Sequence, residues 1–256
     1  MSIQNDNYGV IILTIFLTLI IGIIAAIVGA LVGGGGLISV PALMLFGISP
    51  QAAIATNRLG SFGLSFGAIA KYWKEKKINW KMALVLTLIS LPGTYFGTKI
   101  LISIDKDLLA KIAGIAIIVL VPLIFIKKPI DDLQKEIPRS HTFVGSILYF
   151  FVSIYGGFFG AGTGILARYV LMLLFKMKAV NSNATDIVVG CLSSILGLAM
   201  LLNTGFINWK LGIILFLGML IGGWMGAHIA VKKGDEWVKI AFVVITLVMG
   251  VKLIFF

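Results

Sequence analysis

Two glycine-rich stretches decide the fold of this chain: GALVGGGGLISVP at residues 29–41 and GFFGAGTG at residues 157–164. Each one leads into an apolar segment, residues 37–46 or 165–175, that is shorter than the about 20 helical residues needed to cross a bilayer core. Consecutive glycines allow the backbone to bend sharply. The sequence therefore predicts a short broken or partly inserted helix after each stretch.

The remaining apolar runs predict membrane helices. Hydrophobic residues make up 59% of the 256 residues, charged residues only 12%, and the mean hydropathy is +1.08. This balance is typical of a chain buried in lipid, because a water-soluble surface needs far more polar side chains. We predict an all-α polytopic membrane protein with further spans at residues 10–30, 52–72, 81–100, 108–126, 142–156, 184–202, 211–231 and 238–255.

The chain repeats itself at an offset of 129 residues. INWK at residues 78–81 recurs at 207–210, and ATN at residues 55–57 recurs as ATD at 184–186. The same offset superimposes four further glycine pairs, Gly33 on Gly162, Gly35 on Gly164, Gly93 on Gly222 and Gly97 on Gly226. One such match can arise by chance, whereas a fixed offset that keeps all of them indicates a duplicated unit.

The charges of the loops predict how the two copies are oriented. The loop at residues 71–81 is rich in lysine, whereas its copy at 201–208 has no charge, as expected if only the first faces the cytoplasm. We therefore predict two inverted repeats of five membrane segments each, four long helices plus one short helix. They occupy residues 1–126 and 142–256, with a cytoplasmic linker at 127–141 and both termini outside. Eight crossings, in which the short segments do not span, is the alternative.

Composition excludes several classes of function. The single Cys191 and the two histidines, His141 and His228, are too few for an iron–sulfur cluster or a multi-histidine metal centre. The net charge of +11 is spread over short loops and forms no arm for nucleic acid. The chain has no Lys or Arg before the first apolar run, so we expect that run to remain as a membrane helix. We expect no cofactor, metal, catalytic residue or nucleic-acid partner.

Three ionisable residues fall where membrane interior is expected: Arg58, Arg168 and Asp186. A charge near the bilayer centre costs at least roughly 2.5 to 3.5 kcal/mol, so each should face protein or a water-filled cavity. A guanidinium is permanently charged and presents a planar set of donors, which suits an oxyanion. The alternative is structural: either arginine extends to the membrane interface or neutralises Asp186.

The two glycine-rich stretches are candidate anion sites. Glycine brings backbone N–H groups close to a ligand, and the N-terminus of the following helix adds a partial charge of about +0.5. Close helix packing is the alternative role of these glycines. The predicted substrate-binding residues are Gly33, Gly34, Gly35, Gly36, Asn57, Arg58, Gly162, Thr163, Gly164, Arg168 and Thr185.

Asp186 is the candidate for proton coupling. It occupies the repeat position of Asn57, so equivalent places carry different chemistry. A buried carboxyl group can bind and release a proton during transport. A fixed ion pair between Asp186 and Arg168 is the alternative.

The motif at residues 29–41, the ATN step at 55–57 and the GFFGAGTG copy at 157–164 resemble the TauE/SafE sulfite exporter family, over nearly the whole chain from about residue 20. The resemblance implies transport of a sulfur-containing or organic anion across a bacterial or archaeal cytoplasmic membrane. It also implies a site at Gly33 to Gly36 and Asn57 with Gly162 to Gly164 and Asp186.

The function expected from these features is secondary transport of a small anion such as sulfite, thiosulfate or a sulfonate. The expected partners are the anion, protons as coupling ion and the lipid bilayer. No nucleotide-binding motif is present to supply energy from ATP. An anion channel, a membrane enzyme or a non-transport subunit are the alternatives, and the sequence leaves the anion, the direction, the coupling ion and the oligomeric state open.

Overall fold

The computed structural model describes residues 2–123 and 138–233, and all regular elements within these ranges are helices. The prediction of an all-α membrane protein is confirmed. The helices are α1 (Ser2–Val32), α2 (Gly36–Leu45), α3 (Pro50–Lys74), α4 (Trp80–Ser103), α5 (Lys106–Leu123), α6 (Arg139–Phe158), α7 (Thr163–Leu173), α8 (Ala179–Leu201) and α9 (Trp209–Lys233). The predicted span at 238–255 and residues 127–137 of the linker lie outside the described residues.

Five of the described helices, α1, α4, α6, α8 and α9, are both long and apolar enough to cross a membrane. Helix α3 has 25 residues but is not among them, because it carries the polar residues Asn57, Arg58, Ser61 and Ser65. Those residues line an internal cavity, so α3 has a polar side facing protein. The two short helices begin inside the glycine-rich stretches, α2 at Gly36 and α7 at Thr163, one and two residues before the short apolar segments that the sequence predicts.

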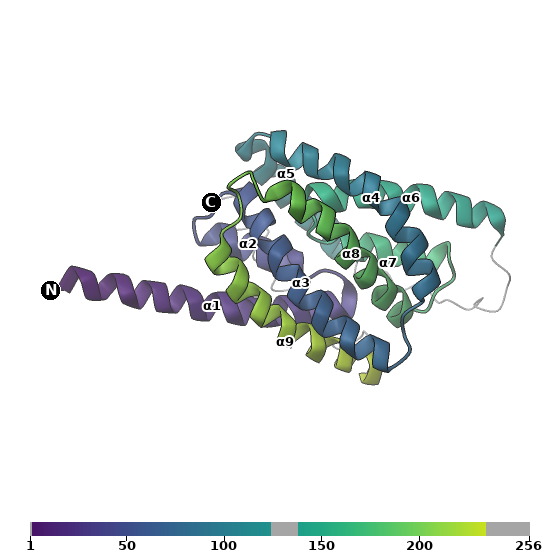
Figure 1. The fold of residues 1–256 in the computed structure, drawn as a ribbon, viewed down its shortest axis with the longest axis horizontal. Coiled ribbons are helices and arrows are strands. Elements are labelled where there is room, and N and C mark those ends of the chain that lie inside the picture. Colours follow the sequence, from purple (N-terminus) through teal and green to yellow (C-terminus); the bar gives the residue numbers. More distant parts are fainter. Residues whose placement is uncertain (1, 124–137, 234–256) are drawn as a thin grey trace.

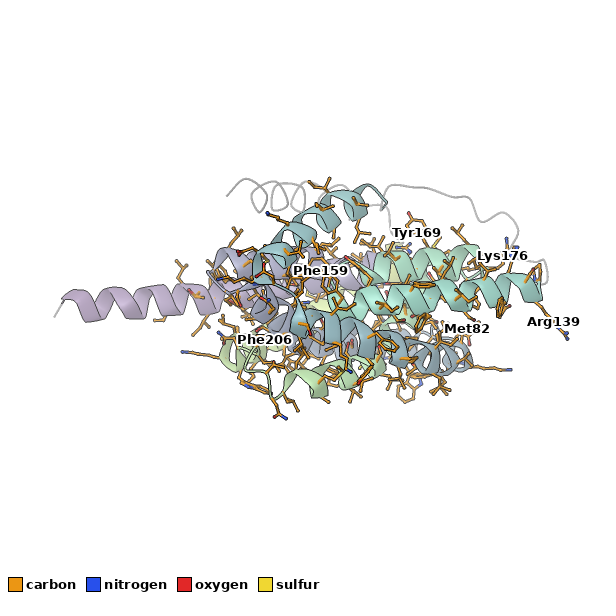
Figure 2. The ribbon with its side chains drawn as sticks, turned by 90° about the horizontal axis from the view of Figure 1, so that it is seen from above. Met82, Arg139, Phe159, Tyr169, Lys176 and Phe206 are labelled. Carbon is orange, nitrogen blue, oxygen red and sulfur yellow. The ribbon has the colours of Figure 1, made fainter. Side chains whose placement is uncertain are left out.

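Each half of the chain contributes one long helix, α4 or α9, that packs against two helices of the other half. Helix α1 packs along α9, and its counterpart α6 packs along α4; α3 also packs on α9, and α8 on α4. Helices α1 and α6 run in opposite directions along the bundle (Figure 1). In Figure 2, Met82 near the start of α4 lies towards one end, with Arg139 and Lys176, whereas Phe206 just before α9 lies towards the other. The predicted inversion requires such opposed pairs, while the count of five segments per half stays a prediction.

Glycine allows close packing where α4 crosses α6. A Cβ atom on Gly97 would overlap the backbone of Ile154 and Phe158. Gly97→Ala should therefore lower the free energy of unfolding by about 1–3 kcal/mol through overpacking. Gly190 on α8 is the matched control: nothing lies within 4 Å of a Cβ there, so Gly190→Ala should stabilise the helix by roughly 0.5–1 kcal/mol. Thermal unfolding in detergent measures both, and equal shifts would contradict the packing explanation.

Candidate functional site

A cavity of about 180 Å³ lies where the two glycine-rich stretches meet α3, α4, α6 and α8. All the predicted site residues line it except Gly34, Gly162, Arg168 and Thr185. Its walls therefore come from both halves of the chain, as expected for a site formed between two copies of one unit. Whether these residues bind a ligand stays a prediction.

The two glycine-rich stretches cross each other at this cavity. A Cβ atom on Gly33 would overlap the backbone of Gly164, and one on Gly36 would come within 2.8 Å of the Ala161 Cα. Gly33 also has a positive φ of 83°, a conformation that favours glycine. This close approach brings the N-termini of α2 and α7 together. The N–H groups of Gly36 and Gly164 lie in the first turns of these helices, where a helix offers them no acceptor.

Asn57 lies beside these helix N-termini. Its Oδ1 accepts a hydrogen bond from the Ser39 hydroxyl at 2.5 Å, which fixes the orientation of the amide. The Asn57 Nδ2 then lies over Gly36, 3.5 Å from where a Cβ of that residue would be. The amide therefore adds a neutral donor to the two backbone N–H groups on one side of the cavity.

Asp186 lies on α8 and is partly exposed to the cavity. Its Oδ1 accepts a hydrogen bond of 2.6 Å from the hydroxyl of Tyr149 on α6. The predicted alternative paired Asp186 with Arg168, but Nη1 of Arg168 donates to the carbonyl oxygen of Leu31 at 3.2 Å. A salt bridge is present between Lys71 and Glu75, at the end of α3.

The side chains of both arginines reach the C-terminal ends of other helices. Arg58 donates from Nη2 to the carbonyl oxygens of Gly156 and Gly157, at 3.1 and 2.7 Å, near the end of α6. Arg168 reaches the carbonyl of Leu31 near the end of α1, the helix equivalent to α6. A positive charge stabilises the negative end of the helix dipole. Each guanidinium therefore has a structural role in addition to any contact with a ligand.

Thr185 does not face the cavity. It is fully buried, and its Oγ1 accepts a hydrogen bond from the backbone N–H of Asn79 at 3.1 Å. The equivalent Thr56 accepts one from the N–H of Asn208 at 3.0 Å. Both threonines hold loops of the opposite half of the chain.

Several polar residues of the cavity wall escaped prediction from the sequence: Ser90, Thr94, Tyr149, Ser153, Ser193 and Ser194. Their signal is a spacing of four within apolar helices, Ser90 with Thr94 and Tyr149 with Ser153, which puts both members on one face. The hydroxyl of Ser153 donates to the carbonyl of Tyr149 at 2.7 Å, as serine in membrane helices commonly does. Because a serine can bond to its own helix backbone, the sequence alone does not distinguish a serine that lines a cavity from one that only bonds within its helix. Within the described part of the chain, no cluster of three or more His, Cys, Asp or Glu could hold a metal ion.

Comparison with known proteins gives a consistent set of relatives. A family model described as sulfite exporter TauE/SafE matches residues 18–253. The chain is 27% identical to a probable membrane transporter protein of Haemophilus influenzae, over 87% of this chain and 88% of that one. It is 27% identical to the probable membrane transporter protein YfcA of Escherichia coli K12, over 87% and 83%, and 28% to YunE of Bacillus subtilis, over 87% and 90%. No solved structure matches the chain.

Proposed function

The chain belongs to the sulfite exporter TauE/SafE family, and from this premise we propose that it is a secondary transporter of a small sulfur-containing or organic anion, such as sulfite, thiosulfate or a sulfonate. It acts in the cell membrane as an exporter or a proton-coupled permease. The observation that carries the proposal is the meeting of two helix N-termini at one cavity between the halves of the chain.

The donors around the cavity favour an anion. Gly36 and Gly164, in the first turns of α2 and α7, line the cavity together with Asn57, whose Nδ2 lies over Gly36. Each helix N-terminus contributes a partial charge of about +0.5, and a site of backbone N–H groups at a helix N-terminus is a common anion site. Arg58 adds a full positive charge to the wall, although its Nη2 is engaged by two carbonyls.

The size of the cavity favours a small substrate. Sites for drug-sized ligands have volumes of roughly 300–1,000 Å³, and this cavity has about 180 Å³. A sulfur oxyanion or a short sulfonate suits such a volume. Asp186 supplies the one carboxylate on the described wall, which is where a coupled proton would bind.

The test is uptake of radiolabelled sulfite, thiosulfate and sulfoacetate into proteoliposomes, with chloride as a control anion. Asn57→Asp keeps an oxygen for the Ser39 hydroxyl but replaces the Nδ2 donor with a negative charge. Two charges about 4 Å apart at an effective dielectric constant near 20 interact by about 4 kcal/mol, so the apparent affinity should fall at least about tenfold. Saturable uptake that weakens in this way supports the proposal.

Ser61→Ala is the matched control in the cavity wall. The Ser61 hydroxyl donates to the backbone of its own helix, at the carbonyl of Asn57, so its loss should change uptake little. Uptake that does not saturate and shows no counterflow would indicate an anion channel. No flux above that of empty liposomes, with a folded protein, would refute transport of these anions.

A further inference from the structure

Two hydrogen bonds between the halves of the chain are related by the sequence repeat. Thr56 and Thr185 are equivalent residues, and so are Asn208 and Asn79, at the offset of 129. Thr56 Oγ1 accepts from the Asn208 N–H at 3.0 Å, and Thr185 Oγ1 accepts from the Asn79 N–H at 3.1 Å. Both hydroxyl groups are fully buried. Each half therefore holds the same loop of the other half by the same bond.

Each of these loops leads into a long helix that packs against the other half of the chain: α4 on α6 and α8, and α9 on α1 and α3. The side-chain Oδ1 of Asn79 caps α4 by accepting from the Met82 N–H at 3.0 Å, and that of Asn208 accepts from the Leu211 N–H at 3.1 Å at the start of α9. Helices α4 and α9 begin towards opposite ends of the bundle, as the places of Met82 and Phe206 show (Figure 2). One of the two bonds therefore lies at each end of the cavity region.

Each threonine directly precedes a residue of the cavity wall. Asn57 follows Thr56 and Asp186 follows Thr185, and both face the cavity. Asn57 is bonded to Ser39 on α2, and Asp186 to Tyr149 on α6. Neighbouring residues of one helical turn move together, because the turn is fixed by backbone hydrogen bonds. A displacement of Asn57 or Asp186 therefore also displaces the adjacent threonine.

We propose that Thr56 and Thr185 are paired latches, each of which closes one end of the transport path by holding the start of α9 or α4. This inference rests on the proposed transporter function. Both bonds are formed in this structure. Opening one end breaks one bond and leaves the other, so the cavity opens to one side at a time. The Thr185 latch, which holds Asn79, faces the side of the lysine-rich loop, and the Thr56 latch, which holds Asn208, faces the opposite side.

The test measures which side of the membrane reaches the cavity. The single cysteine, Cys191, is replaced by alanine, and Ser194→Cys places a thiol on the cavity wall. A membrane-impermeant maleimide is applied from either side of oriented vesicles. Thr185→Val should raise labelling from the side of the lysine-rich loop, and Thr56→Val from the opposite side. The ratio of the two labelling rates should change by about two- to tenfold, the range that one net hydrogen bond supports.

Controls separate a latch from general loosening. Thr56→Ser and Thr185→Ser keep an oxygen acceptor and should restore the ratio of the unsubstituted protein. Thr→Ala at each position repeats the test with a smaller side chain, should a valine variant fold poorly. A shift in the same direction for both positions, or unchanged labelling in all variants, would overturn the proposal.

Labelling does not depend on the identity of the substrate. If the labelling ratio shifts in opposite directions in the two variants but no anion is taken up, the latch proposal is supported and the proposed substrate class is refuted. If uptake is saturable and normal but the labelling ratio does not shift in opposite directions, the transporter function is supported and the latch proposal is refuted.

Discussion

Asp186→Asn is expected to abolish the part of anion accumulation that a proton gradient drives. Asparagine keeps an oxygen that can accept the 2.6 Å hydrogen bond from the Tyr149 hydroxyl, so the wall of the cavity is preserved. It cannot take up or release a proton near neutral pH. A gradient of about one pH unit supports roughly tenfold accumulation per coupled proton, because about 1.4 kcal/mol is a factor of ten. In Asp186→Asn, the accumulation that the pH gradient drives should therefore fall from about tenfold to none.

The measurement compares accumulation with and without a pH gradient in proteoliposomes. Exchange of labelled for unlabelled anion at equal pH should persist in Asp186→Asn, since exchange needs no net movement of protons. Tyr149→Phe is the matched variant: it removes the hydroxyl that bonds Asp186 but leaves the carboxyl group able to titrate, so gradient-driven accumulation should remain. Full accumulation in Asp186→Asn would assign coupling to another group or another ion.

The architecture followed from the sequence because its causes are local. The closely spaced glycines at 33–36 and 160–164 allow the positive φ angles that end one helix and start the next. The apolar runs on either side form helices in lipid. The sequence repeat pairs Thr56 with Thr185, and these two residues make matching bonds. Those bonds join residues about 106 and 152 positions apart, so their partners were not visible in the sequence.

The site followed only in part, because side-chain direction within a helix depends on tertiary packing. Thr185 and Asp186 are neighbours, yet one is buried against a loop and the other faces the cavity. Tyr149 is a buried residue of α6, a helix that is otherwise largely exposed. Its hydroxyl is important only because Asp186 of α8 comes within 2.6 Å. The role of the arginines depended on where α1 and α6 end, which the runs of apolar residues did not fix.

Arg58→Gln is expected to destabilise the protein strongly even when no anion is present. The guanidinium donates to Thr98 at 2.9 Å and to the carbonyls of Gly156 and Gly157, and these acceptors are in the interior between α4 and α6. Hydrogen bonds from a charged group contribute about 1.5–3 kcal/mol each. The shorter glutamine cannot replace this set, so we expect a loss of at least about 3 kcal/mol in the free energy of unfolding.

Thermal unfolding in detergent, with and without sulfite, separates the two roles of Arg58. If Arg58 mainly holds the end of α6, the variant unfolds at a lower temperature in both conditions, while the increase on adding sulfite persists. If Arg58 is instead the main anion ligand, the anion-free protein keeps its stability and the increase disappears, because a ligand stabilises only through its affinity for the folded state. Ser61→Ala, in the same helix and on the same cavity, should change neither quantity. The bonds of Arg58 to two carbonyls near a helix end favour the first result.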